Sequence, residues 1–72
     1  MAIHLRAARV NAGFTQEEVV QELRRRGFKI SKNTLISYEQ YRTKPDIELA
    51  KALAALYGVT VDDIIFFPED CA

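Results

Sequence analysis

The sequence predicts an all-α fold, a compact bundle of five short helices, and three kinds of observation support this. Apolar residues recur at the three- and four-residue spacing of amphipathic helices. Four of the five segments begin at a hydroxyl or carboxylate side chain able to cap a helix, and three end at a glycine. No alternating run of apolar and polar residues predicts a strand. The 72 residues suffice for one small domain.

The first predicted helix, over residues 3–12, carries an arginine on its apolar face. Leu5, Ala8 and Ala12 make that face, and Arg9 falls on the same side. An unpaired charge facing a core is costly, so Arg9 needs a carboxylate or another hydrogen-bond acceptor nearby. The remaining apolar side chains of this helix lie on another face and are expected to be exposed (Ile3, Val10).

The second predicted helix begins at Thr15, and Glu18 three residues later completes a capping box. Its core stripe consists of Val19, Val20 and Leu23. Arg24 to Arg26 finish the helix and Gly27 stops it. These three arginines either offer a basic surface to phosphate or form a solvated helix end that the helix dipole favours.

The third predicted helix, Lys32–Tyr41, has two different faces, and Ser31 can cap its start. Leu35 and Tyr38 point toward the core. The other face carries Lys32, Asn33, Ile36, Ser37 and Gln40. An apolar back with an amide-and-lysine front suits a helix that reads base edges in a DNA major groove. The simpler alternative is an ordinary amphipathic surface helix, on which Ile36 is merely exposed.

The rest of the chain completes the bundle. Pro45 predicts a loop after the third helix, and Asp46 caps a fourth helix that runs to about Tyr57. Thr60 caps a short fifth helix, whose first turn holds Asp62 and Asp63. We expect one domain over residues 1–67 and a flexible tail over residues 68–72.

The charge distribution argues for a partner that carries charge, although the formal net charge is zero. Residues 1–44 carry nine basic and four acidic side chains, and residues 45–72 carry one basic and six acidic side chains. Such a dipolar molecule can turn its basic half toward phosphate.

Other classes of site find little support in the composition. Cys71 is the only cysteine, which excludes an internal disulfide and a cysteine-based zinc site. His4, the only histidine, is expected to be solvated, and the neighbouring carboxylates Asp62 and Asp63 look like capping residues. We therefore expect no enzyme activity, no metal and no cofactor. No apolar run is long enough to predict a membrane helix.

Three motifs in order resemble the Cro/C1-type (xenobiotic-response-element) helix-turn-helix family. Phe14–Val19 (FTQEEV) is similar to the opening of that family's second helix, and Ile30–Glu39 (ISKNTLISYE) to its recognition helix. Leu53–Ile65 (LAALYGVTVDDII) looks like its closing segment. The resemblance spans about residues 5–66, with the helix-turn-helix unit over about residues 16–40. It implies a lambda-repressor-like DNA-binding domain.

The resemblance also implies roles for individual residues. The expected base contacts are Lys32, Asn33, Thr34 and Ser37. The expected phosphate contacts are Gln16, Arg42 and Lys44. The resemblance pairs Arg9 with Glu39, a structural ion pair that would supply the carboxylate required by the first helix.

The chain departs from the family pattern at three places. The connection between the second and third helices is about five residues longer than the family's usual turn. Val20 stands where the family often has alanine, and Tyr41 where it often has glycine. The longer connection leaves the docking angle of the third helix open.

The function expected from these features is sequence-specific binding of double-stranded DNA by a transcriptional regulator, most readily a repressor. We expect a bacterial or phage protein that acts in the cytoplasm, at the nucleoid, without a small-molecule effector. A homodimer would bind an inverted repeat, through an apolar segment too large for a small monomer to bury (Ile64, Ile65, Phe66, Phe67). The alternative is a protein-interaction module of antitoxin or phage accessory type with the same fold.

Overall fold

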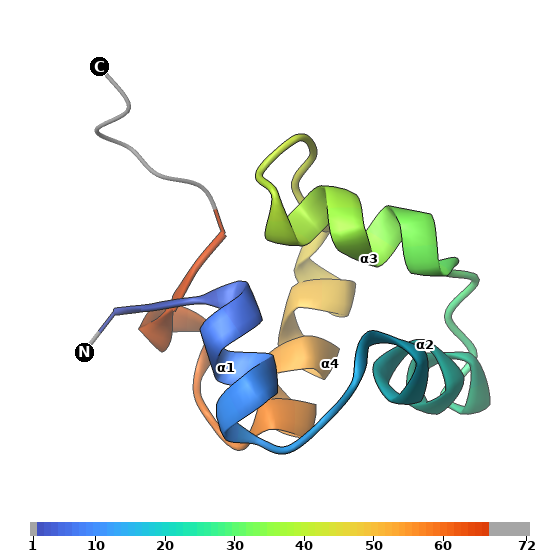
Figure 1. Cartoon of the computed structure of the whole chain (residues 1–72), viewed down its shortest axis with the longest axis horizontal. Helices are drawn as coiled ribbons and strands as arrows, with labels where there is room; N and C mark the ends of the chain where they lie inside the picture. Colours follow the sequence, from blue (N-terminus) through green and yellow to red (C-terminus); the bar gives the residue numbers. More distant parts are fainter. Residues whose placement is uncertain (1, 67–72) are drawn as a thin grey trace.

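Four α-helices pack around one core in a computed structural model, which describes residues 2–66 (Figure 1). The elements are α1 (Leu5–Asn11), α2 (Gln16–Arg25), α3 (Lys32–Glu39) and α4 (Ile47–Tyr57). Helices α2 and α3 pack against each other, and α1 contacts both α3 and α4. The predicted all-α class is confirmed.

The predicted caps are present at α2, α3 and α4. The Thr15 hydroxyl accepts from the backbone N–H of Glu18 at 3.1 Å, and the Glu18 carboxylate accepts from the backbone N–H of Thr15 at 2.8 Å. The Asp46 carboxylate accepts from the backbone N–H of Leu49 at 2.9 Å. These bonds satisfy N–H groups that the first helical turn leaves without partners, which fixes where each helix begins.

The C-terminal part of the domain differs from the prediction of a fifth α-helix. Val61–Asp63 form a single 3₁₀ turn, η1, and Ile64–Ile65 form a short strand, β2. Strand β2 pairs in parallel with β1 (Ile3–His4), with Ile3 opposite Ile64. The prediction that the chain has no strand was therefore wrong. A two-residue strand has no measurable period, and this one depends on contact between distant parts of the chain.

The ends of two helices also differ from the prediction. Helix α1 begins at Leu5, because Ile3 is extended in β1; its side chain is half-buried against the core, not exposed. Val10 is exposed, as predicted, at 56%. Helix α3 ends at Glu39, and Tyr41 adopts a left-handed conformation with φ of 62°. Glycine adopts this conformation without strain, which fits the glycine that the resemblance led us to expect at this position.

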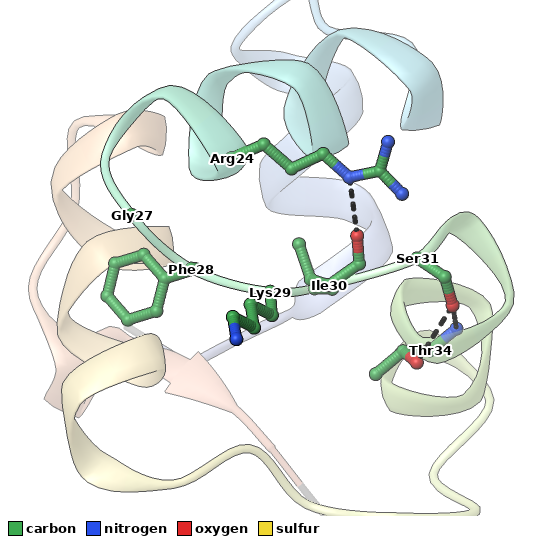
Figure 2. A pocket seen from close by; sticks show the side chains of 7 residues that line it. All are labelled: Arg24, Gly27, Phe28, Lys29, Ile30, Ser31 and Thr34. Carbon is green, nitrogen blue, oxygen red and sulfur yellow. Dashed lines mark hydrogen bonds between the residues drawn. The ribbon is translucent and has the colours of Figure 1, made fainter.

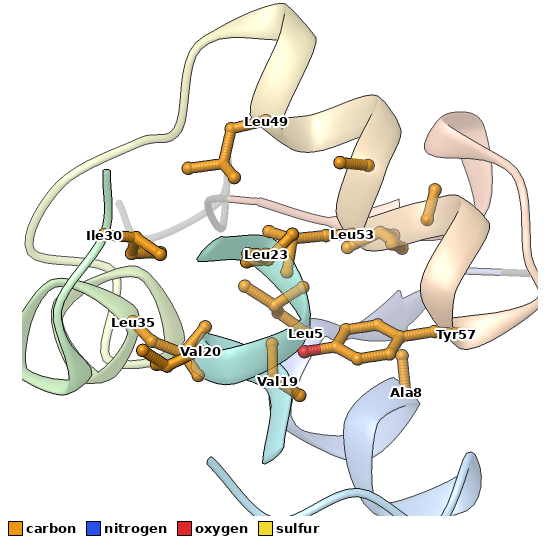
Figure 3. Packing of buried hydrophobic residues seen from close by; sticks show 13 residues of the cluster. Leu5, Ala8, Val19, Val20, Leu23, Ile30, Leu35, Leu49, Leu53 and Tyr57 are labelled. Carbon is orange, nitrogen blue, oxygen red and sulfur yellow. The ribbon is translucent and has the colours of Figure 1, made fainter. Parts of the chain in front are cut away.

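The core draws a fully buried side chain from every α-helix (Figure 3). These residues are Leu5, Val19, Leu23, Leu35 and Leu53. Each buried leucine contributes about 2 kcal/mol through removal of apolar surface from water. Leu35 is the residue that anchors α3, so the opposite face of α3 is directed outward. Phe67 and the expected tail, 68–72, lie outside the described residues.

Candidate nucleic-acid interface

The first turn of α3 presents polar side chains to solvent, and the Ser31 cap fixes where the helix begins. The Ser31 hydroxyl accepts from the backbone N–H of Thr34 at 3.2 Å and lies 3.0 Å from the Thr34 hydroxyl. Lys32 and Asn33 are exposed, whereas Thr34 is half-buried. Of the four expected base contacts, Lys32 and Asn33 are therefore the most accessible. The Thr34 hydroxyl is engaged with the cap.

Further along α3 the outward face becomes less polar and less exposed. Ser37 is half-buried, so its hydroxyl sits lower on the surface than the side chains of the first turn. Ile36, expected to be exposed, is also half-buried. Asn33 and Lys32 thus form the most prominent part of the helix.

The far end of α3 is held by the ion pair between Arg9 and Glu39. The Arg9 Nε donates to one carboxylate oxygen of Glu39 at 2.7 Å, and a terminal guanidinium nitrogen lies 3.4 Å from the other. Both residues are buried, and Arg9 also donates to the backbone carbonyl of Phe14 at 2.9 Å. The charge on the apolar face of α1 therefore has the partner that the sequence required.

Gln16 joins the same network. Its side-chain Nε2 donates to Glu39 Oε1 at 3.0 Å, so one carboxylate of α3 binds both α1 and α2. A side-chain amide has two N–H donors, and this bond uses one of them. The sequence placed Gln16 at the start of α2, but nothing in its spacing indicated this contact with Glu39.

Lys32 lies next to the start of α2. Its ammonium is 3.9 Å from the Glu17 carboxylate, and both side chains are more than half exposed. Such an exposed pair is worth less than about 1 kcal/mol, so Lys32 can leave Glu17 for a stronger anion at little cost. Arg6, Gln16 and Lys32 help to line one open surface hollow of about 390 Å³ at this position.

The loop after α3 carries the other two expected phosphate contacts. Arg42 and Lys44 are exposed on it, and the backbone N–H of Arg42 donates to the carbonyl of Ser37 at 2.9 Å. Tyr41 packs beside the His4 ring, with ring centroids 5.7 Å apart, and its hydroxyl is hydrogen-bonded to His4 Nδ1. His4 is exposed, as expected, but its contact with the loop was not predicted. The one signal in the sequence was Tyr41, an aromatic residue where the resemblance led us to expect glycine.

Other kinds of site find no support in the part of the chain that the structure describes. Within residues 2–66, no three histidine, cysteine or acidic residues are grouped so that they could hold a metal ion. None of the helices over the same residues is long and apolar enough to cross a membrane.

The sequence is similar to those of known helix-turn-helix proteins. A helix-turn-helix family model matches residues 5–64. The chain is 33% identical over 61 residues to the cryptic phage CTXphi transcriptional repressor RstR of Vibrio cholerae, covering 85% of this chain and 50% of the repressor. It is 30% identical over 56 residues to an uncharacterized helix-turn-helix-type transcriptional regulator of Methanocaldococcus jannaschii, covering 78% of this chain and 77% of the regulator.

The chain thus spans half the length of the first relative and about three quarters of the second. No solved structure matches it significantly. The family model covers most of the chain, including all of the unit from α1 to α4. The chain belongs to the Cro/C1-type helix-turn-helix family.

Proposed function

We propose that this protein binds a specific sequence of double-stranded DNA and regulates transcription, as a repressor, by inserting α3 into the major groove. The observation that carries this proposal is the asymmetry of α3. Its back is fixed by Leu35 and Glu39, and its first turn presents Lys32 and Asn33 to solvent. A lysine suits the acceptors of guanine, and an asparagine suits the donor–acceptor pair of adenine.

The remaining contacts follow from the position of each side chain around α3. Thr34 and Ser37 would contact bases from lower on the surface. The phosphate contacts would come from the start of α2 and the loop after α3 (Gln16, Arg42, Lys44). In this role the protein works at the nucleoid in the cytoplasm, as a binding protein and not an enzyme.

A homodimer on an inverted repeat, with half-sites about one helical turn apart, would supply affinity that a single small domain lacks. The apolar segment expected to form the interface needs one correction. Ile64 is only 7% exposed and belongs to the core, so it is not available to a second copy. Ile65 and Phe66 are half-buried and remain candidates.

Selection from a random pool of duplex DNA, followed by gel-shift measurement, tests the proposal. We expect enrichment of an inverted repeat and binding that weakens as salt rises. The double variant Lys32→Ala, Asn33→Ala should lose sequence preference. Lys51→Ala is the control, since it removes a lysine exposed on α4 and should bind normally.

The outcome that would overturn the proposal is equally specific. If no sequence is enriched and no duplex is bound in a salt-dependent way, the function as a DNA-binding regulator is wrong. If the double variant instead loses a protein partner, the fold serves as a protein-interaction module of antitoxin or phage accessory type.

A further inference from the structure

The connection between α2 and α3 holds an arginine in a fixed position beside the recognition helix. The Arg24 Nε donates to the backbone carbonyl of Ile30 at 2.9 Å, a bond between the last turn of α2 and the residue before the α3 cap (Figure 2). This bond uses one of the five N–H donors of the guanidinium. It orients the side chain without occupying the two terminal nitrogens.

A second basic residue, Lys29, lies near Arg24. Arg24 and Lys29 line an open hollow of about 560 Å³ together with Gly27, Phe28, Ile30, Ser31 and Thr34. None of these lining residues is acidic, and no carboxylate within residues 2–66 pairs with Arg24. The adjacent arginines differ, because Arg25 and Arg26 both pair with Glu22, at 2.9 and 3.5 Å.

The direction of the side chain distinguishes Arg24 from the other basic group of the hollow. In Figure 2 the Arg24 guanidinium extends along the connection toward Ser31, whereas the Lys29 ammonium lies on the side of Phe28. The Arg24 guanidinium therefore lies near the first turn of α3, the part of the helix that carries Lys32 and Asn33.

The spacing of side chains along α2 fits the dimensions of DNA. Gln16 and Arg24 are eight residues apart, which corresponds to about 12 Å along the helix axis. The major groove of B-DNA is also about 12 Å wide. A helix lying across the groove would bring one of these residues toward each phosphate wall, with α3 between them. We propose, on the basis of the DNA-binding function above, that Arg24 binds a backbone phosphate of the operator beside the entry point of α3.

In this proposal the connection between α2 and α3 positions Arg24. It allows α2 to continue to Arg25, and the chain then returns through the left-handed Gly27, with φ of 96°, so that the carbonyl of Ile30 comes back to Arg24. The guanidinium geometry suits two oxygens of one phosphate group.

Salt titration of DNA binding by Arg24→Gln tests the assignment on the operator selected with the wild-type protein. Removing one phosphate contact should lower the slope of log affinity against log salt by about 0.9, which makes binding about eightfold weaker at about 0.1 M salt. Lys29→Gln and Arg25→Gln are matched controls, since each removes one positive charge from the same region. Both should keep the wild-type slope.

A second measurement separates a direct contact from a structural effect of the lost Ile30 bond. Operators that carry a single uncharged methylphosphonate are bound by wild-type protein and by Arg24→Gln. At one position, neutralisation should weaken wild-type binding about eightfold and leave the variant unaffected, because the contact is already gone. If Arg24→Gln merely loosened the connection, each neutralised phosphate would weaken binding by the variant as much as it weakens binding by the wild-type protein.

Two results would overturn the assignment while leaving the proposed function intact. The first is a wild-type salt slope for Arg24→Gln. The second is a variant that changes which base is preferred at one position, since Arg24 would then read a base edge and not a phosphate. If the wild-type protein binds no duplex DNA, both the assignment and the proposed function fail.

Discussion

The two ends of α3 are held in very different ways. At its C-terminal end, Glu39 is buried and receives hydrogen bonds from Arg9 of α1 and Gln16 of α2. At its N-terminal end, the exposed Ser31 cap and one bond from Arg24 to Ile30 hold the chain. A charged group out of water makes strong, orientation-dependent contacts, whereas an exposed cap contributes about 1 kcal/mol.

This difference suggests a division of labour along α3. The buried network fixes the helix relative to the rest of the domain, so that the polar first turn always emerges at the same place. The exposed N-terminal end keeps its side chains free to meet a ligand. Lys32 illustrates this freedom, because its contact with Glu17 is long and solvent-exposed.

The largest expected effect is at the buried end. Glu39→Gln removes the charge that compensates Arg9, and loss of one partner from a buried pair costs about 3 kcal/mol or more. Denaturant unfolding of the variant and of the wild-type protein measures this loss. Glu22→Gln, which removes a partly exposed partner of Arg25 and Arg26, should cost less than about 1 kcal/mol.

A double variant sharpens the interpretation of that first experiment. Arg9→Met with Glu39→Met removes both charges and fills similar volume, so it should recover more than half of the stability lost in Glu39→Gln. Equal losses for Glu39→Gln and Glu22→Gln would show that the buried pair does not anchor α3.

The effect at the exposed end should be smaller. Ser31→Ala removes the side-chain acceptor for the backbone N–H of Thr34, which should cost about 1 kcal/mol. Thermal unfolding followed by circular dichroism would detect the change. Ser37→Ala is the matched control in the interior of the same helix, where alanine should be neutral or slightly stabilising. A Ser31→Ala variant as stable as Ser37→Ala would contradict the role of the cap.

The same contrast explains what sequence reasoning recovered. Caps and helical periodicity are short-range properties, so the caps of α2, α3 and α4 could be read from single residues such as Thr15, Ser31 and Asp46. An arginine on an apolar stripe signals a missing carboxylate, and the family resemblance supplied Glu39 as its partner. Caps and helical faces, which depend on local spacing, were therefore predictable from the residues, whereas Glu39 as the partner of Arg9 came from the resemblance.

The features that sequence reasoning missed depend on the path of the chain between elements. The pairing of Ile3 with Ile64 requires segments about sixty residues apart to meet. The Arg24 bond to Ile30 depends on how the connection turns at Gly27, and the contact of His4 with Tyr41 on how β1 lies beside the loop after α3. None of these contacts has a periodic or spacing signature.

The smallest expected effect at neutral pH, and one that changes with pH, belongs to Tyr57 beside the buried network. Its hydroxyl is buried and has no hydrogen-bond partner among residues 2–66, so Tyr57→Phe should be neutral or raise stability by up to about 1 kcal/mol at pH 7. Burial, reinforced by the negative charge of Glu39 and partly offset by Arg9, raises the pKa of Tyr57 far above its ordinary value of 10.0.

The sign of the resulting pH dependence distinguishes the variant from the wild-type protein. The raised pKa means that folded Tyr57 keeps its proton while the unfolded chain loses it above about pH 10. The free energy of unfolding of the wild-type protein should therefore fall with rising pH by up to about 1.4 kcal/mol per unit, more steeply than that of Tyr57→Phe. Burial also raises the pKa of Tyr38 and Tyr41, but both proteins share that contribution. Urea unfolding between about pH 9 and pH 11 measures the difference, and parallel slopes would show that Tyr57 ionises as readily in the folded protein as in the unfolded chain.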